Sequence, residues 1–111
     1  MEYVTVEFYF DESKNKTLLD KARKFIMELF NQKGLLCIEN NEKNIIFRDI
    51  CDKYGKFWWA LDNLADNTTV VDCLSEAYFI FEDKEDVLNK FLRVVVWWNE
   101  FIQIDYIWLR Y

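Results

Sequence analysis

Acidic side chains are concentrated between Asp62 and Asp86, where Lys84 is the only basic residue. Eight carboxylates less one lysine give this stretch a net charge of −7, against −6 for the whole chain. The carboxylates belong to Asp62, Asp66, Asp72, Glu76, Glu82, Asp83, Glu85 and Asp86. Because Lys and Arg are needed to neutralise phosphates, this stretch repels nucleic acid. It attracts a basic protein surface and speeds its association at low salt, so we predict a basic protein partner.

The same carboxylates also have a plainer interpretation, because surface charge keeps an aromatic-rich domain in solution. Aromatic residues make up 19% of the chain, and Tyr and Trp are the types that anchor interfaces. We predict Trp58 and Tyr78 as anchors beside the acidic stretch. These two residues and the eight carboxylates are the predicted partner-binding residues. By contrast, residues 13–33 carry six basic residues against Asp20 and Glu28, so that region is positive.

Catalytic chemistry lacks its usual residues in this chain. There is no His to act as a general base or as a metal ligand. Neither Gly34 nor Gly55 belongs to a glycine-rich phosphate-binding pattern. The acidic residues 82–86 lack the spacing and central Gly of a Ca²⁺ loop, and a helix start attracts carboxylates through its dipole alone. We therefore predict a protein that is not an enzyme and that holds no cofactor or metal.

The cysteines and the first residues of the chain indicate the cellular compartment in which the protein is expected. Cys37, Cys51 and Cys73 are odd in number and widely spaced, which buried free thiols in a reducing compartment explain best. Met1-Glu2-Tyr3 lacks the basic and apolar regions of a signal peptide. No run approaches the ~18 uncharged apolar residues that span a bilayer. The expectation is a cytoplasmic protein that does not enter a membrane.

A strand followed by a helix is the clearest structural signal. Residues 3–10 alternate between apolar and polar-bearing side chains, which is the period of a strand with one buried face. The apolar members are Val4, Val6, Phe8 and Phe10. A stripe with helical period follows, consisting of Leu18, Leu19, Ala22, Phe25, Ile26, Leu29 and Phe30. Ser13 or Thr17 is expected to cap this helix, and Gly34 to close it in the left-handed conformation.

The middle of the chain leaves alternatives open. Residues 35–38 predict a short buried strand, residues 40–43 a polar turn, and residues 45–47 another strand. Residues 52–55 read as a turn in which Gly55 supplies a positive φ, followed by a returning strand at 56–61. A helix from Trp58 to Ala65 fits the 3.6 period as well. Residues 67–74 fit either a short helix capped by Thr68 or a strand.

From Ala77 the opening pattern returns. Residues 78–81 predict a strand, and Asp83 is expected to cap a second helix. Its inward stripe consists of Val87, Leu88, Phe91, Leu92, Val95 and Trp98. Residues 101–111 alternate again and predict a last strand.

A strand–helix–strand unit at each end of the chain predicts the fold class. At 111 residues the chain has room for a single domain, residues 1–111. We predict an α+β domain of the ferredoxin-like, split βαβ kind. It would have an antiparallel sheet, two helices on one face, and an inserted middle hairpin or helical segment.

The other sheet face is then rich in large side chains, with Glu7, Gln103 and Asp105 between them. They are Tyr3, Tyr9, Tyr78, Ile80, Phe101, Ile107 and Leu109. This face is either open to a partner or buried by residues 45–74 folding across it.

The function that fits is a small acidic inhibitor that neutralises a basic, nucleic-acid-handling protein. An immunity protein or antitoxin for a nuclease-type toxin has this character, and so does a phage-encoded (for example anti-CRISPR) inhibitor of a defence enzyme. The alternative is a homodimeric regulatory or small-ligand-binding module that pairs through its sheet face.

Overall fold

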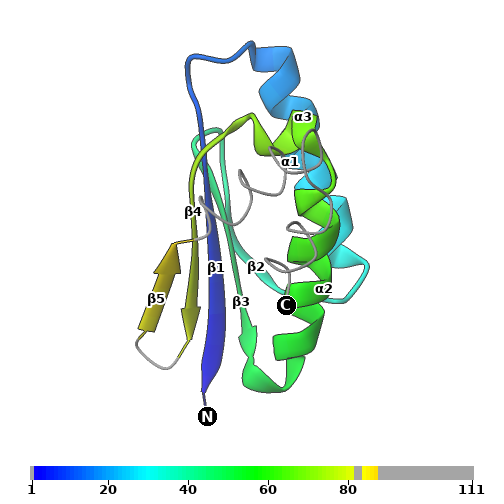
Figure 1. The fold of residues 1–111 in the computed structure, drawn as a ribbon, viewed down its shortest axis with the longest axis vertical. Coiled ribbons are helices and arrows are strands. Elements are labelled where there is room, and N and C mark those ends of the chain that lie inside the picture. The colour runs from blue at the N-terminus through cyan, green and yellow to red at the C-terminus, as the bar shows by residue number, and fades with distance from the viewer. Residues whose placement is uncertain (1, 82–83, 88–111) are drawn as a thin grey trace, which may run out of the picture.

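The computed structural model describes residues 2–81 and the strand at residues 84–87. The order of elements is β1 (Tyr3–Phe10), α1 (Lys16–Asn31), β2 (Cys37–Asn40), β3 (Asn44–Ile50), the 3-10 turn η1 (Cys51–Lys53), α2 (Tyr54–Ala65), α3 (Thr68–Val71), β4 (Leu74–Phe81) and β5 (Lys84–Val87). The described part of the chain is thus α+β, with its strands in an antiparallel sheet beside the helices (Figure 1).

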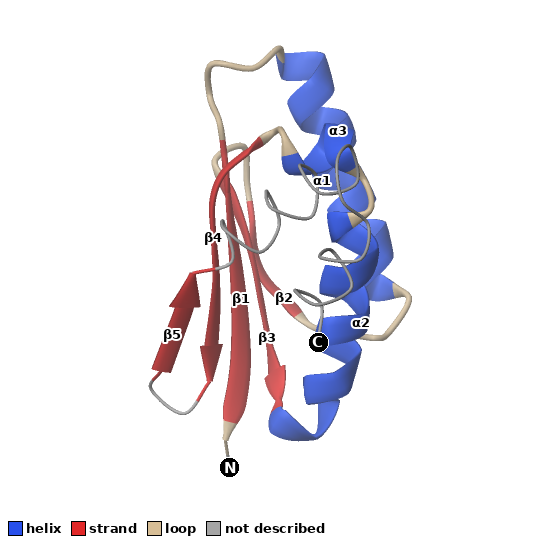
Figure 2. Cartoon of the chain, in the orientation of Figure 1, coloured by secondary structure: helices blue, strands red, loops and turns tan. Residues whose placement is uncertain are grey.

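The sheet has the strand order β2-β3-β1-β4-β5, so the first strand of the chain lies at its centre. Strand β1 pairs antiparallel with β3 on one side and with β4 on the other. Strand β2 forms one edge of the described sheet and β5 the other. Figure 2 shows that β1, β3 and β4 are the long strands and that β2 and β5 are short.

The alternation predicted for β1 is confirmed. Its apolar residues Val4, Val6, Phe8 and Phe10 are all buried, while Tyr3, Thr5, Glu7 and Tyr9 are half-buried or exposed. We call the first set the inner face of the sheet and the second set the outer face. The period of two therefore separates the two faces, because successive side chains of a strand point to opposite sides.

Aromatic rings form the centre of the core between the inner face and the helices. Phe30 of α1 stacks on Phe47 of β3 with ring centroids 4.3 Å apart. Its ring also contacts the edge of Phe8 at 5.5 Å and lies 6.4 Å from Phe57 of α2. One residue of the helical stripe thus joins two strands and a second helix.

The prediction for the C-terminal end of α1 is confirmed, and the prediction for its N-terminal cap is wrong. Gly34 has a φ of 66° and follows the helix, as predicted. The cap, however, is neither Ser13 nor Thr17 but Asn15, whose side chain accepts a hydrogen bond from the backbone N–H of Thr17 at 2.8 Å. Asn is as good a cap as Ser or Thr, so residue type alone did not distinguish the candidates.

The returning strand predicted at residues 56–61 is wrong, and the helical alternative is right. Helix α2 spans Tyr54–Ala65, so Gly55 lies inside a helix and supplies no positive φ. The residues that α2 buries have the helical period, and they are Phe57, Ala60, Leu61, Leu64 and Ala65. Residues 68–71 also form a short helix, capped by Asn67 and not by Thr68.

Strand β2 is an edge strand and not the buried strand predicted at residues 35–38. Only Leu35 of that run is buried, whereas Leu36 is 59% exposed and Ile38 is 53% exposed. Cys37 is half-buried and packs against the core. The apolar run therefore alternates between core and surface, which an edge position allows.

The predicted start of the second helix, directly after Asp83, is also wrong. Residues 84–87 form β5, which pairs antiparallel with β4. Asp83 itself, the rest of that predicted helix and the strand predicted at 101–111 lie outside the described residues. The second strand–helix–strand segment is instead β3-α2-β4, in the middle of the chain.

Hydrogen bonds and an ion pair of Asp49 connect the start of β2 to the end of β3. Asp49 accepts hydrogen bonds from the N–H groups of Leu36 at 3.1 Å and Ile50 at 2.8 Å. Lys53 donates to the Asp49 carboxylate and to the carbonyl of Gly34, both at 2.9 Å. These bonds fix the loop that leads from α1 into β2.

Candidate functional site: an acidic and aromatic sheet face

The register of the strands determines which residues share the outer face. Glu7 of β1 lies opposite Tyr78 of β4, and Tyr9 lies opposite Glu76. On the other side of β1, the outer-face partners are Asn44, Ile46, Arg48 and Ile50 of β3. Residues directly opposite each other in an antiparallel pair point to the same side. Tyr3, Tyr9, Tyr78 and Ile80 therefore share this face, as predicted; Phe101, Ile107 and Leu109 lie outside the described residues.

Residues 45–74 do not lie across the outer face. Strand β3 is part of the sheet, and α2 packs against the inner-face residue Phe79, on which Trp58 stacks at 4.9 Å. Tyr54 of the same helix meets Phe79 edge-on at 5.6 Å. The alternative in which the middle segment buries the outer face is therefore wrong.

Glu7, Tyr9, Glu76 and Tyr78 form a compact group on the outer face, which we call the tyrosine–glutamate cluster. The hydroxyl of Tyr9 donates to Oε1 of Glu7 at 2.8 Å, and that of Tyr78 donates to Oε2 of Glu76 at 3.1 Å. The two rings meet edge to face with centroids 6.1 Å apart. The cluster therefore presents two carboxylates around a fixed pair of rings.

Each half of the cluster is the same tripeptide pattern. Glu7-Phe8-Tyr9 and Glu76-Ala77-Tyr78 both read Glu-x-Tyr, with the middle residue buried. Because the strands are antiparallel, each Glu faces the Tyr of the neighbouring strand. Sequence analysis placed Glu76 and Tyr78 in the site and omitted Glu7 and Tyr9. The repeated pattern was the signal that identifies all four.

Charge in the cluster affects the titration of Tyr9. The hydrogen bond to Glu7 raises the pKa of Tyr9 from 10.0 to about 12, and burial adds to the rise. Ionisation of Tyr9 would place a phenolate beside a carboxylate and would lose the donated hydrogen bond. The neutral, hydrogen-bonded form is therefore stabilised well into the alkaline range.

We expect the pKa of Tyr9 to return toward 10.0 when Glu7 is replaced by Gln. The difference in tyrosinate absorbance between the protein and its Tyr9→Phe variant isolates this one side chain. Because the folded pKa is raised, the contribution of Tyr9 to stability is present below about pH 10 and is lost as the pH rises through about 12. An unchanged midpoint in Glu7→Gln would show that the hydrogen bond does not control the titration.

Arg48 and the aliphatic side chains give the rest of the outer face a different character. The guanidinium of Arg48 lies over the ring of Tyr3, 4.5 Å from its centroid. Ile46 and Ile50 are half-buried beside it, and Leu36 and Ile38 follow at the β2 edge. The outer face therefore has an acidic, aromatic half over β1 and β4, whereas over β2 and β3 the aliphatic side chains lie among Glu39, Asn44 and Arg48.

The structure separates the predicted partner-binding residues. Glu76 and Tyr78 lie on the outer face, whereas Trp58, Asp62 and Asp66 lie on or at the end of α2. Asp72, just after α3, is ion-paired with Lys14 at 3.1 Å, so the acidic stretch and the basic region meet there. Glu85 and Asp86 are in β5, opposite Ile80 and Phe79 in the register. Glu82 and Asp83 lie outside the described residues.

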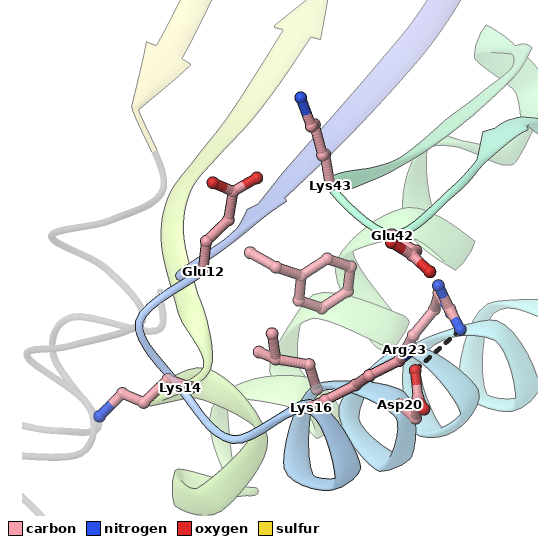
Figure 3. A pocket seen from close by; sticks show the side chains of 9 residues that line it. Glu12, Lys14, Lys16, Asp20, Arg23, Glu42 and Lys43 are labelled. Carbon is pink, nitrogen blue, oxygen red and sulfur yellow. Dashed lines mark hydrogen bonds and ion pairs between the residues drawn. The ribbon is translucent and has the colours of Figure 1, made fainter.

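An open hollow of about 280 Å³ lies between the start of α1, the end of β1 and the β2–β3 turn. Phe10 and Leu19 contribute its apolar part, and charged residues of both signs surround them: Glu12, Lys14, Lys16, Asp20, Arg23, Glu42 and Lys43. Figure 3 shows Arg23 directed at Asp20, with which it pairs at 3.0 Å, and Lys14 extending away from the hollow. Exposed ion pairs of this kind contribute only about 0–1 kcal/mol. Because both acidic and basic residues line the hollow, the charge of its lining points to no single class of ligand.

The cysteines show the features of structural thiols. All three are free, and Cys73 is buried with its thiol donating to the carbonyl of Thr69 at 3.4 Å. Burial raises the pKa of the Cys37 and Cys73 thiols above their ordinary value, which lowers the thiolate fraction at neutral pH. Within residues 2–81, His, Cys, Asp and Glu form no group of three or more that could hold a metal ion. None of the helices described is long and apolar enough to cross a membrane.

Comparison with known proteins adds no relative to these observations. No family model, no curated protein and no solved structure matches this chain.

Proposed function

We propose that this chain is a non-enzymatic binding protein that contacts a basic partner protein through the outer face of its sheet. The observation that carries the proposal is the tyrosine–glutamate cluster, in which Glu7 and Glu76 flank the packed rings of Tyr9 and Tyr78. Rings of this type supply contact area at little cost in side-chain entropy, because the hydrogen bonds and the ring contact already hold them.

Carboxylates beside aromatic rings suit one chemical class of partner side chain. An Arg guanidinium forms charge-assisted hydrogen bonds with a carboxylate and also stacks on an aromatic face. Carboxylates and aromatic rings are both present here on the adjacent strands β1 and β4, at spacings fixed by the register of these strands. The chain as a whole carries a charge of −6, which adds a long-range attraction for a cationic surface.

A nucleic-acid-handling enzyme is the partner class that these features favour. Its substrate groove is lined with Lys and Arg because it binds phosphates. A protein that covers such a groove with carboxylates and rings acts as an inhibitor, as an immunity protein or antitoxin does. Such an inhibitor would work in the cytoplasm, where its target and free thiols are both found.

The finer architecture that we propose is the ferredoxin-like split βαβ sandwich. It is supported by two strand–helix–strand segments, β1-α1-β2 and β3-α2-β4, whose strands alternate in the order β2-β3-β1-β4. Figure 1 draws α1, α2 and α3 on one side of the sheet, which leaves the outer face away from the helices. Among the described residues, this arrangement accounts for why one sheet face is core and the other lies away from the helices.

Charge reversal tests the proposal. Protein captured from the source cell by the tagged chain should be lost when Glu7 and Glu76 are both replaced by Lys. For the identified partner, we expect roughly tenfold weaker binding per reversed carboxylate, through slower association and faster release. Binding of the unchanged protein should also weaken as salt rises, because the attraction is electrostatic.

Glu28→Lys is the matched control, because Glu28 is exposed on α1 and away from the outer face. It makes a single charge reversal and should weaken binding several-fold less than either single change at Glu7 or Glu76. Thermal unfolding of each variant establishes that it is folded. Equal losses in Glu28→Lys and Glu76→Lys, or retention that is indifferent to salt, would refute the outer face as the contact surface.

A further inference from the structure

A hollow of about 410 Å³ lies between α1 and α3, two helices that pack beside each other on one side of the sheet (Figure 1). We call it the α1–α3 hollow. Its apolar lining consists of Leu18, Ala22 and Phe25 from α1 and of Val70 and Cys73 from α3 and the residues that follow it. The three residues from α1 are spaced three or four apart, so they share one face of that helix. Because ligand pockets have volumes of about 300–1,000 Å³, the hollow is large enough for a small molecule.

The polar part of this lining consists of groups that donate hydrogen bonds. Lys21 is its only charged residue, and it takes part in none of the ion pairs found within residues 2–81 and 84–87. The side-chain oxygen of Asn67 accepts from the N–H of Val70 at 3.1 Å, which leaves the NH₂ group of the amide to donate. The exposed Thr69 adds a hydroxyl, which can donate as well. Among the described residues that line the hollow, none carries a carboxylate.

Two other hollows on the described surface lack this combination. The hollow beside Phe10 is lined by both acidic and basic residues. Another, of about 480 Å³, lies between the end of α1 and β2, and its charged residues Asp49 and Lys53 pair with each other at 2.9 Å. Of these three, the α1–α3 hollow alone combines an apolar lining with a cation that has no acidic neighbour in that lining.

These features determine the chemistry of the occupant. A carboxylate balances the charge of Lys21 and accepts charge-assisted hydrogen bonds from it. A hydrocarbon chain removes from water the apolar surface of Leu18, which is 38% exposed, and of Phe25, which is half-buried. We propose that the α1–α3 hollow binds a small anionic amphiphile of the fatty-acid class, with its carboxylate at Lys21 and its chain along the apolar residues.

Isothermal titration calorimetry of the full chain with decanoate at neutral pH tests the proposal. Decanol and decyltrimethylammonium carry the same hydrocarbon chain with a neutral or a cationic head group. We expect decanoate to bind at least about tenfold more tightly than either. Because the chain carries a net charge of −6, non-specific attraction would favour the cationic amphiphile. A preference for the carboxylate therefore reports the local charge of the hollow.

Two matched pairs of variants locate the site. Lys21→Met should weaken the binding of decanoate about tenfold and leave that of decanol unchanged. Lys24→Met is its control, because Lys24 is exposed on the same helix and is not among the residues that line the hollow. Thr69→Phe fills the hollow and should weaken the binding of both amphiphiles, whereas Thr68→Phe, at an exposed neighbour outside the lining, should weaken neither. Circular dichroism shows that each variant remains folded.

Equal affinities for the three amphiphiles, or equal losses in Lys21→Met and Lys24→Met, would overturn the proposal. Binding to vesicles of anionic phospholipid without binding of free decanoate would also overturn it, since the ligand would then be a membrane surface. The site is separate from the outer face, because the helices lie on the other side of the sheet (Figure 1). Lys21→Met should therefore leave capture of the basic partner intact, and reversal of Glu7 and Glu76 should leave decanoate binding intact, so either proposal can fail without the other.

Discussion

Replacing Phe30 with Ala is expected to lower the free energy of unfolding by about 3–5 kcal/mol, which is a large part of the stability of a domain of this size. Phe30 has no exposed surface and stacks on Phe47 at 4.3 Å. Its removal leaves a cavity where two strands and two helices meet, and it also removes ring contacts with Phe8 and Phe57. Urea unfolding followed by tryptophan fluorescence measures the change.

Leu18→Ala is the control for that experiment, since Leu18 belongs to the same helix and to the same apolar stripe in the sequence. It is 38% exposed, so truncation leaves no enclosed cavity and should cost less than about 1 kcal/mol. Similar losses in the two variants would mean that the core does not centre on Phe30. A smaller denaturant slope in Phe30→Ala would instead indicate a change in the compactness of one of the states.

Replacing Asp49 with Ala is expected to cost about 2 kcal/mol, because it removes the acceptor of three hydrogen bonds, one of which is charge-assisted. The N–H groups of Leu36 and Ile50 and the ammonium group of Lys53 all donate to this carboxylate. Asp49→Asn keeps an acceptor oxygen and loses the ion pair, so its cost should be about half as large. Unfolding in urea at neutral pH compares the two variants.

The ion pair also makes the stability depend on pH. Burial alone would raise the pKa of Asp49, but the hydrogen bonds from Lys53, Ile50 and Leu36 outweigh it and hold the pKa below its ordinary value of 3.8. Because the folded pKa is depressed, the stabilisation is fully present above the unfolded pKa and is lost as the pH falls through the folded value. The stability difference between the protein and Asp49→Asn should therefore be constant above about pH 5 and shrink below about pH 4. A difference that persists at lower pH would contradict the role of the charge.

The sequence by itself determined β1 and α1, and with them the division into an inner and an outer face. Residues 3–10 alternate strictly over four periods, which excludes a helix there. The apolar stripe in residues 16–31 repeats with the helical period over several turns, which excludes a strand. The same parity placed Tyr3, Tyr9, Tyr78 and Ile80 on one face, because the direction of a strand side chain depends only on its position along the strand.

Tertiary structure decided what short segments do. Residues 56–61 have a strand-like composition, yet they are helical because packing of Phe57 and Trp58 against the inner face outweighs a weak local preference. The acidic residues on either side of Lys84 suit a helix start, yet residues 84–87 pair antiparallel with β4. The tyrosine–glutamate cluster likewise exists only because β1 and β4, more than 60 residues apart, are neighbours. No local pattern contains that pairing, since it results from the burial of distant apolar faces against the same helices.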